Sequence, residues 1–427
     1  MSNNTQRHIE VYAHWAGLSS PSLMGVLYAT LSRGKEIFSF EYATQWLNDN
    51  QSHVLDPSLQ FFQGQQYAPD GQDNFGIFLD SSPDRWGRIL MDRREAQLAR
   101  EEGRKECKLL ESDYLLGVYD EHRIGAIRFK INSKGPFLDD NKNYSAPPWT
   151  SLRALANASL QLEKEDAQTN PSYAKWLKML IAPGGSLGGA RPKASVVDIQ
   201  RHPWIAKFPS RHDENDIGAW EMVAYKLAES AKLTMAEAKL EKFNSRYHTF
   251  LNKRFDRTDL GERVHFASAM TLLQRNDGDD AADGASYLEL VEFITRQGAQ
   301  PEKDLEQLWR RIIFYICVSN VDDHLRNHGF IFHPSNGWVL SPAFDINPVA
   351  TGDGLKLNVS ESDNSQDLEL AKEVAKYFRI KPSDANKIIK DVVKAVKNWR
   401  EVATSLGISS SEQDRMANAF RVAEHKS

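Results

Sequence analysis

The stretch VSNVDDHLRNHGFIFHPSNGWVLSPAFDINP, from Val318 to Pro348, decides the fold that we predict for this chain. It contains a loop with four polar residues, Asp322, Asp323, His324 and Asn327. A segment with helical periodicity leads directly into this loop, and its apolar side chains share one face (Leu305, Leu308, Trp309, Ile312 and Ile316). A polar loop supported by a buried helix is a frequent place for binding and catalysis.

A predicted hairpin follows the loop and returns the chain towards it. Residues Gly329–His333 are typical of a strand, PSNG of a turn, and Trp338–Leu340 of the returning strand. The chain then reaches Asp345. We therefore expect the Asp345 carboxylate to lie near the polar loop.

This order of residues meets the requirements of phosphoryl transfer from ATP. A carboxylate must accept the proton of the attacking hydroxyl, and oxygen ligands must hold Mg²⁺ over the phosphates. In protein kinases an Asp and an Asn five residues later have these roles, and a second Asp beyond them binds the metal. Asp322, Asn327 and Asp345 have this spacing. They predict a kinase-type site for ATP and Mg²⁺.

A glycine-rich stretch upstream, GGSLGGARPKAS from Gly184 to Ser195, is the predicted phosphate loop. Paired glycines let backbone N–H groups approach a phosphate closely, although a flexible turn would also explain the glycines. A Walker A loop is excluded, because Ala190 and Arg191 stand where Lys and Ser or Thr are needed. A Rossmann fingerprint is excluded, because no two of these glycines are separated by one residue.

Further kinase-like parts follow in the expected order. Next come two predicted strands, Ala194–Asp198 and Pro203–Phe208, which a short polar turn joins. The second strand carries Lys207. A helical segment then has Glu221 near its start, where its carboxylate could pair with Lys207. Each residue alone also fits a solvated surface charge, so the prediction depends on the order of all the parts.

Composition narrows the class of protein. The 53 basic and 58 acidic residues give a formal net charge of −5, so the global charge gives no sign of a nucleic-acid partner. The two cysteines, Cys107 and Cys317, form no disulfide framework and suit a reducing cytosol. The apolar run Ile312–Val318 is too short to span a bilayer, and the first residues lack a signal-peptide core. We expect a soluble cytoplasmic protein without a membrane partner.

Together these segments resemble the HipA family of bacterial serine/threonine kinases, the toxins of certain toxin–antitoxin systems. The family's N-terminal segment resembles FGIFLDSSPDRWGRILMDRR, its glycine loop SLGGARPKAS and its lysine strand WIAKFPS. Its hinge resembles KRFDR, its catalytic loop NVDDHLRNHGF and its metal segment SPAFDINP. The resemblance covers most of the chain. It implies an α+β, two-lobed, protein-kinase-like fold with a mixed α/β N-lobe, an extra N-terminal subdomain and a mainly helical C-lobe.

The N-terminal part shows strand-like pieces at His8–Ala13 and Arg123–Phe129 and a helix-like piece at Asp84–Glu101. Residues 131–148 are rich in Asn, Asp, Lys and Pro, which is typical of a linker. We therefore predict an N-terminal subdomain over residues 1–130, an N-lobe over 131–257 and a C-lobe over 258–427.

The resemblance also implies a role for individual residues. Asp322 would be the catalytic base, and Asn327 and Asp345 would bind Mg²⁺. Ser186, inside the glycine loop, would be an inhibitory autophosphorylation site, because a phosphate there would repel ATP. The residues implied to contact ATP are Gly188, Gly189, Ala190, Arg191, Lys193, Lys207, Lys253, Arg254, Phe255, His324 and Asn327.

The resemblance further implies partners. Known members modify aminoacyl-tRNA synthetases, which halts translation and growth, and a small DNA-binding antitoxin restrains them. We expect a protein substrate, by analogy a synthetase, and a HipB-like antitoxin through which DNA is contacted only indirectly. A small-molecule kinase is the first alternative, and the N-terminal LDSSPDRWGR segment argues against it. A binding module that helps an antitoxin hold DNA is the second, and the intact Asp322, Asn327 and Asp345 argue against it.

A basic segment, Lys372–Arg400, lies near the C-terminus. Its pattern predicts an amphipathic helix with Ser383 as the N-cap and lysines along one face (Lys387, Lys390, Lys394 and Lys397). A solvated face over the C-lobe explains these lysines, and contact with DNA phosphates in an antitoxin complex is the alternative.

Overall fold

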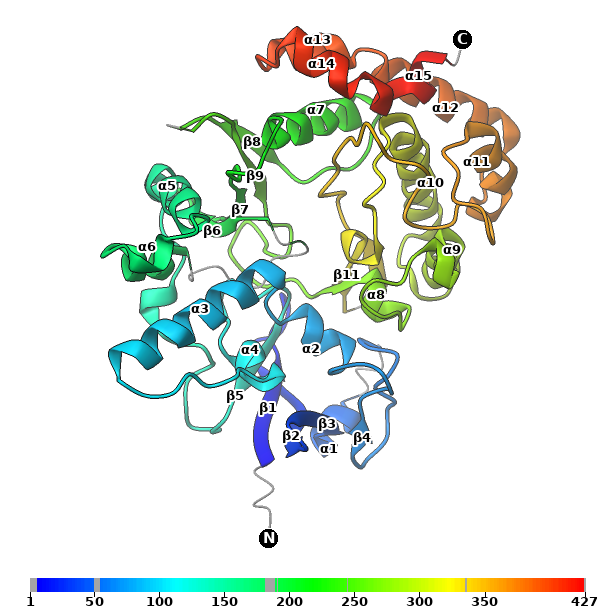
Figure 1. Ribbon diagram of the computed structural model, residues 1–427. Coiled ribbons are helices and arrows are strands. Elements are labelled where there is room, and N and C mark those ends of the chain that lie inside the picture. Colours follow the sequence, from blue (N-terminus) through cyan, green and yellow to red (C-terminus); the bar gives the residue numbers. More distant parts are fainter. Residues whose placement is uncertain are drawn as a thin grey trace. The chain divides into compact units, whose positions relative to one another are not determined.

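The structure is a computed structural model that describes residues 6–49, 54–180, 189, 191–243, 245–334 and 336–425 (Figure 1). The chain forms two compact units. The first unit comprises Met1–Arg211 and Arg254–Ala267, and the second comprises His212–Lys253 and Ser268–Ser427. None of the helices within the described ranges has both the length and the hydropathy of a membrane span.

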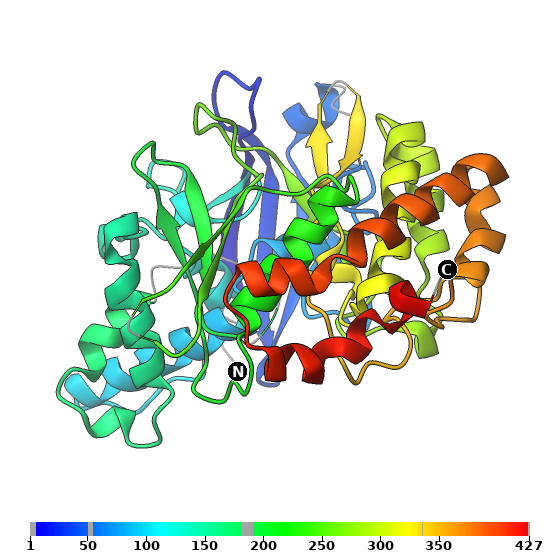
Figure 2. The same cartoon turned by 90° about the horizontal axis from the view of Figure 1, so that it is seen from above.

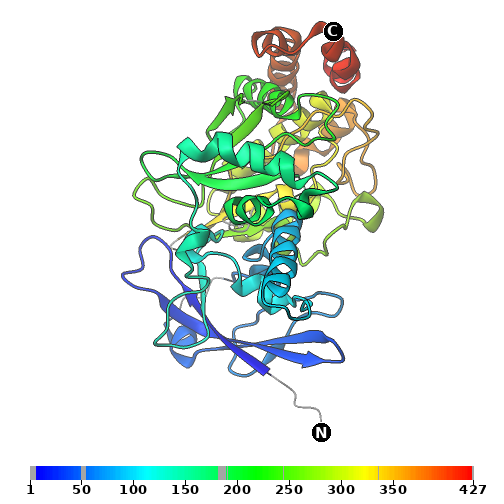
Figure 3. The same ribbon diagram turned by 60° about the vertical axis from the view of Figure 1, so that its left-hand side comes forward.

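A five-stranded antiparallel sheet is the core of the first unit, and Figure 3 shows its β1–β3 strands in blue. The strand order is β4-β3-β2-β1-β5. Alternate β1 side chains, those of Ile9, Val11 and Ala13, are fully buried, and burial stabilises by about 1.5–3 kcal/mol for each large apolar side chain. The strands are β1 (Gln6–Ala13), β2 (Ser22–Ser32), β3 (Lys35–Tyr42), β4 (Gln66–Tyr67) and β5 (Ile127–Lys130).

The first unit also contains six α-helices within the described residues, and α2 packs on this sheet. The Phe78 ring of α2 lies 5.6 Å from the Phe40 ring of β3 and 5.9 Å from the Phe129 ring of β5, so α2 covers one face of the sheet. Helix α3 begins after Asp84, whose side chain accepts the N–H of Gly87, and this confirms the predicted helix. The helices are α1 (Thr44–Asn48), α2 (Gly76–Asp80), α3 (Arg85–Glu101), α4 (Glu111–Leu116), α5 (Leu152–Leu162) and α6 (Tyr173–Leu180).

The two strands predicted after the glycine-rich stretch are confirmed as β6 (Lys193–Val197) and β7 (Pro203–Lys207). They pair antiparallel, and the register sets Lys193 directly opposite Lys207. Asp198 orders the turn between them, because its carboxylate accepts the indole N–H of Trp204 and the backbone N–H of His202. This hairpin belongs to the first unit.

The second unit begins with α7 (Ile217–Ser230), which is capped by the Asp216 side chain. Gly218 lets this helix approach β9, since a Cβ at this position would stand 2.6 Å from the His248 carbonyl oxygen. Strands β8 (Ala238–Glu241) and β9 (Thr249–Lys253) pair antiparallel. Strand β10 (Phe266–Ser268) crosses the boundary between the units.

The rest of the second unit is mainly helical around α10 (Pro301–Val318), the predicted helix before the polar loop. All five apolar residues that define its predicted buried face are fully buried, which confirms the pattern. In Figure 2 α7, in green, runs beside α13, in orange-red. The remaining elements are α8 (Ala269–Leu272), α9 (Tyr287–Gln297), β11 (Gly329–His333), β12 (Gly337–Leu340), α11 (Leu368–Val374), α12 (Pro382–Val396), α13 (Trp399–Ser405), α14 (Ser410–Met416) and α15 (Arg421–His425).

The basic helix near the C-terminus is confirmed as α12, with its lysines exposed and its Ile and Val side chains buried. The predicted N-cap, Ser383, is wrong. The N-cap is Lys381, and Pro382 takes the first helical position. Proline suits that position, because its φ is already helical and the missing N–H has no partner within the first turn.

Candidate active site

The polar loop starts where α10 ends, at Ser319. This residue has a left-handed backbone with φ of 48°, which turns the chain out of the helix. Its hydroxyl donates to Gln366 at 2.9 Å and accepts from Arg421 at 3.0 Å. Ser319 and the next residue, Asn320, are almost completely buried. The beginning of the loop is therefore fixed within the unit.

Asp322 and Asn327 face each other across this loop. The Asn327 amide nitrogen Nδ2 donates to the backbone carbonyl of Asp322 at 2.9 Å, and the Asp322 residue is exposed. Asn327 is only 3% exposed, and no donor within the described part of the chain reaches its Oδ1. A buried amide oxygen without a donor is costly. Such an oxygen is also a suitable Mg²⁺ ligand.

The hairpin that should return Asp345 to the loop is confirmed. Strands β11 and β12 pair with Phe330 opposite Leu340, and the Ser341 N–H then donates to the Gly329 carbonyl at 2.9 Å. Ser335, in the predicted turn, lies outside the described residues. Asp345 has φ of 56°, a conformation that costs a non-glycine residue on the order of 1 kcal/mol.

Asn347 connects Asp345 to the polar loop. Its Nδ2 donates to Asp345 Oδ1 at 3.1 Å, and its backbone N–H donates to Asn320 Oδ1 at 3.0 Å. These two bonds stabilise the left-handed Asp345 backbone and set its carboxylate next to the segment that carries Asp322. The structure thus brings together the loop and the carboxylate that the sequence predicted to meet.

Asp323, the neighbour of Asp322, lies inside the protein. It is fully buried, its Oδ1 accepts the Lys356 N–H at 3.1 Å, and its Oδ2 lies 4.0 Å from His328 Nε2. Burial lowers the pKa of His328, with Asp323 acting in the opposite direction. His324 is half-buried, and its carbonyl accepts the Asn327 N–H at 2.8 Å. These residues hold the loop in shape.

Most of the predicted phosphate loop cannot be compared with the structure. Ser186, Gly188 and Ala190 lie outside the described residues. Gly189 has φ of 85°, a left-handed conformation that favours glycine. Arg191 is half-buried.

The two predicted phosphate-binding lysines of this region have different surroundings. Lys193 is 3% exposed, and its Nζ lies 2.9 Å from Asp84 Oδ2 and 3.4 Å from the Gly189 carbonyl oxygen. Lys207 is half-buried at the end of β7. Its predicted partner Glu221 is buried on α7, in the other unit, so this ion pair stays a prediction.

In the predicted adenine hinge, Lys253–Phe255, the Arg254 side chain is bound to other protein groups. The Arg254 guanidinium is buried and donates to both Asp256 oxygens and to the carbonyl of His122 at 2.6 Å. The Arg254 N–H donates to the Pro203 carbonyl at 3.0 Å. The Lys253 N–H donates to the Glu237 carbonyl at 2.8 Å, and the Phe255 ring lies 5.9 Å from that of Phe266.

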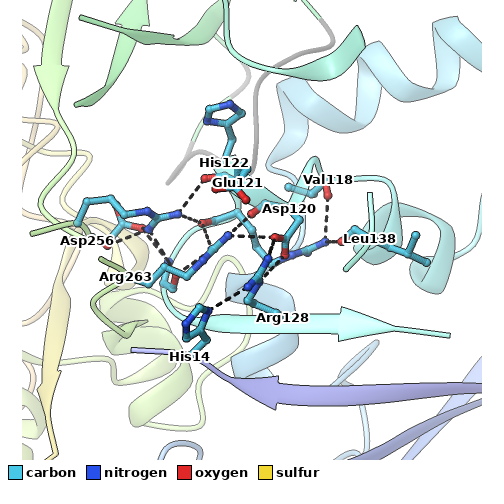
Figure 4. Close-up of polar contacts among 12 residues, drawn as sticks. His14, Val118, Asp120, Glu121, His122, Arg128, Leu138, Asp256 and Arg263 are labelled. Carbon is cyan, nitrogen blue, oxygen red and sulfur yellow. Dashed lines mark hydrogen bonds and ion pairs between the residues drawn. The ribbon is translucent and has the colours of Figure 1, made fainter. Parts of the chain in front are cut away.

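Sequence analysis missed the buried network to which Arg254 belongs (Figure 4). Asp120 and Asp256 are its carboxylates, and most of the guanidinium groups donate to the backbone carbonyls of residues 118–125. Burial lowers the pKa of His122, inside this segment, to about 3, and the neighbouring Arg254 adds to the shift. The arginines are Arg123, Arg128, Arg254, Arg257 and Arg263.

Comparisons with known proteins give both a family and a fold. The sequence model of the HipA-like C-terminal domain family matches residues 185–400, half of the chain. A Haemophilus influenzae protein named "Putative kinase" is 24% identical over 184 residues, which cover 39% of this chain and 53% of that protein. The match therefore spans about half the length of this relative.

Among solved structures, a chain from the Shewanella oneidensis toxin–antitoxin complex of HipA, HipB and operator DNA superposes with a TM-score of 0.63. The superposition covers 97% of this chain and 95% of that chain, at 16% sequence identity. At this identity the likeness concerns the fold. It confirms the predicted α+β, protein-kinase-like HipA fold.

Proposed function

The chain belongs to the HipA family, and from this premise we propose that it is an ATP-dependent serine/threonine-protein kinase. One observation carries the proposal. Asn327 uses its amide nitrogen to hold the Asp322 carbonyl, and its buried Oδ1 meets no donor within the described ranges. This oxygen is therefore available to a cation beside an exposed carboxylate, as phosphoryl transfer requires.

In this proposal three residues of the second unit divide the chemistry. Asn327 and Asp345 would hold Mg²⁺, which would neutralise charge on the ATP phosphates. The Asp322 carboxylate accepts the proton of a serine or threonine hydroxyl while the hydroxyl oxygen bonds to the γ-phosphorus. The bond from that phosphorus to the bridging oxygen of ADP breaks. The fixed loop contributes by orienting Asp322 before the substrate arrives.

The contacts with ATP in the first unit are part of the same proposal. Lys207 would pair with the phosphates, and the backbone of Lys253–Phe255 would receive adenine. The glycine-rich stretch would lie along the phosphates through Gly188, Gly189, Ala190 and Arg191. A phosphate on Ser186 would add about two negative charges near that position and so weaken ATP binding.

A protein partner also follows from the family. The Shewanella oneidensis protein was solved in complex with HipB and operator DNA. We propose that this chain likewise binds a small DNA-binding antitoxin, and that it contacts DNA indirectly through that complex. The phosphoryl acceptor would be a protein, and by analogy with the family an aminoacyl-tRNA synthetase.

Radiolabelled ATP tests the central claim. Purified protein with Mg²⁺ and lysate should transfer the γ-phosphoryl group to serine or threonine of discrete proteins, identified by mass spectrometry. Asp322→Gln should fold and bind ATP but lose transfer on the order of a hundredfold or more, because the base is removed. Normal transfer by a well-folded Asp322→Gln protein would contradict the mechanism. Transfer to small metabolites without any protein labelling would contradict the substrate class.

A further inference from the structure

Asp84 lies in the N-terminal LDSSPDRWGR motif, to which the proposed reaction gives no task. Its Oδ1 accepts the Gly87 N–H at 2.8 Å and so caps α3. Its Oδ2 lies 2.9 Å from Lys193 Nζ, and the Asp84 and Lys193 side chains are 2% and 4% exposed. One buried carboxylate therefore caps a helix and also neutralises an ammonium group at the start of β6.

The first turn of α3 holds Lys193 at two points. The indole Nε1 of Trp86 donates to the Lys193 carbonyl at 3.0 Å, and Asp84 binds the ammonium group. The same ammonium lies 3.4 Å from the Gly189 carbonyl oxygen. Lys193 thus connects the N-terminal motif to Gly189, the one glycine of the predicted phosphate loop among the described residues.

Because of the register of β6 and β7, the ion pair between Asp84 and Lys193 also affects the charge surroundings of Lys207. Lys193 and Lys207 are directly opposite each other, and such partners have Cβ atoms about 4.5–5.5 Å apart on the same face of the sheet. Two like charges at directly opposite strand positions destabilise the pair unless one of them has a counter-ion. A buried ammonium also needs a counter-ion. Asp84 supplies one for Lys193, so the positive charge of Lys193 adds less repulsion at the half-buried Lys207.

We propose that Asp84 is a positioning residue of the nucleotide site. It fixes Lys193, and through Lys193 it sets the start of β6, the Gly189 carbonyl and the electrostatic surroundings of Lys207. The inference rests on the proposed kinase function. It replaces the role of phosphate ligand, which family resemblance gives to Lys193, by that of an internal support.

Asp84→Asn is the informative substitution, because the amide oxygen still caps Gly87 while the negative charge is lost. The KM for MgATP should rise on the order of tenfold while kcat falls less than about threefold, since the effect concerns nucleotide positioning. Asp367→Asn is the matched control, the same change at the exposed N-cap of α11, where the side chain accepts the Glu369 N–H. Its KM and kcat should equal those of the wild type.

A second variant covers the case in which Asp84→Asn fails to fold. Trp86→Phe leaves a smaller aromatic ring in place of the buried indole and removes the N–H that holds the Lys193 carbonyl. It should raise the KM for MgATP by about threefold. If Lys193 were itself a phosphate ligand, Asp84→Asn would release it, so the KM would fall or stay within about twofold. That result, or an unchanged KM in a folded Trp86→Phe protein, overturns the proposal. Wild-type protein without phosphoryl transfer would instead overturn the kinase function.

Discussion

Replacing Asp256 by Asn should strongly destabilise the first unit. Asp256 is 3% exposed, and its carboxylate accepts from Arg254, from Arg257 at 2.7 Å and from the Gly125 N–H at 2.8 Å. Burial alone would raise the pKa of Asp256, but Arg254 and Arg257 outweigh burial and hold this pKa well below its usual range. An Asn side chain has one acceptor oxygen, and its NH₂ group would face guanidinium donors.

The expected loss of unfolding free energy in Asp256→Asn follows from the charges of the buried network. Five arginines and two aspartates give 5 − 2 = +3, and the substitution makes this +4 within a largely buried cluster. Removing one partner of a buried ion pair costs about 3–5 kcal/mol. The whole unfolding free energy of a protein is about 5–15 kcal/mol. The variant should therefore lose a large part of its stability.

Urea unfolding followed by circular dichroism, together with a thermal melt, measures this effect. The wild type should exceed Asp256→Asn by about 3–5 kcal/mol in unfolding free energy and by on the order of 10 °C in Tm. Asp414→Asn is the control, since its ion pair with Arg400 is largely exposed and such pairs contribute little. If Asp256→Asn unfolded like this control, the backbone carbonyls alone would satisfy the arginines, and the reasoning would be refuted.

Four other predictions follow from the site and the buried charges. Asp345→Asn should weaken ATP binding in the presence of Mg²⁺ but not in its absence, as titration calorimetry would show, because the proposed metal ligand loses its charge. Burial lowers the pKa of His122 and of His265 to about 3. Below the unfolded pKa of about 6.5 only the unfolded state gains these protons, so the unfolding free energy at pH 5 should be about 2 kcal/mol lower for each histidine than at pH 7. Incubation with Mg-ATP should phosphorylate Ser186 and reduce ATP affinity, and labelling of other proteins without Ser186 modification would contradict this switch. If the basic helix contacts DNA in an antitoxin complex, replacing its four exposed lysines by Gln should lower the affinity of the complex for DNA and the salt dependence of that affinity. An unchanged salt dependence would mean that these lysines form a solvated face (Lys387, Lys390, Lys394 and Lys397).

The helix and the hairpin on either side of the polar loop were predicted well because their sequence signals are local. The β11–β12 hairpin has a turn motif between two short apolar strands, and the pair β6–β7 has the same form. In contrast, β2 and β3 were missed, although β2, with 11 residues, is the longest strand of their sheet. Their two-residue turn is Arg33-Gly34, with φ of 50° and 82°. A turn with two positive φ angles usually carries Asn-Gly or Asp-Gly. Because Arg33 stands in place of Asn or Asp, the sequence did not indicate a hairpin turn here.

The buried charges could not be predicted, because burial depends on contacts between distant segments. Asp84 and Lys193 are 109 residues apart, and Asp256 meets Gly125 across 131 residues. In the sequence the three charged residues, Asp84, Lys193 and Asp256, are indistinguishable from solvated surface charges. Only the fold shows that they are internal counter-ions.

The KRFDR motif shows what this distinction means for function. Family resemblance assigns the motif to the adenine hinge, yet Arg254 and Asp256 are buried and bound to each other. Their side chains hold the turn of residues 120–125 and are not available to a nucleotide. Three of the motif's four charged residues, Arg254, Asp256 and Arg257, therefore serve the stability of the first unit. If adenine binds at this segment, the buried charges of Arg254 and Asp256 fix the position of the main chain that receives it.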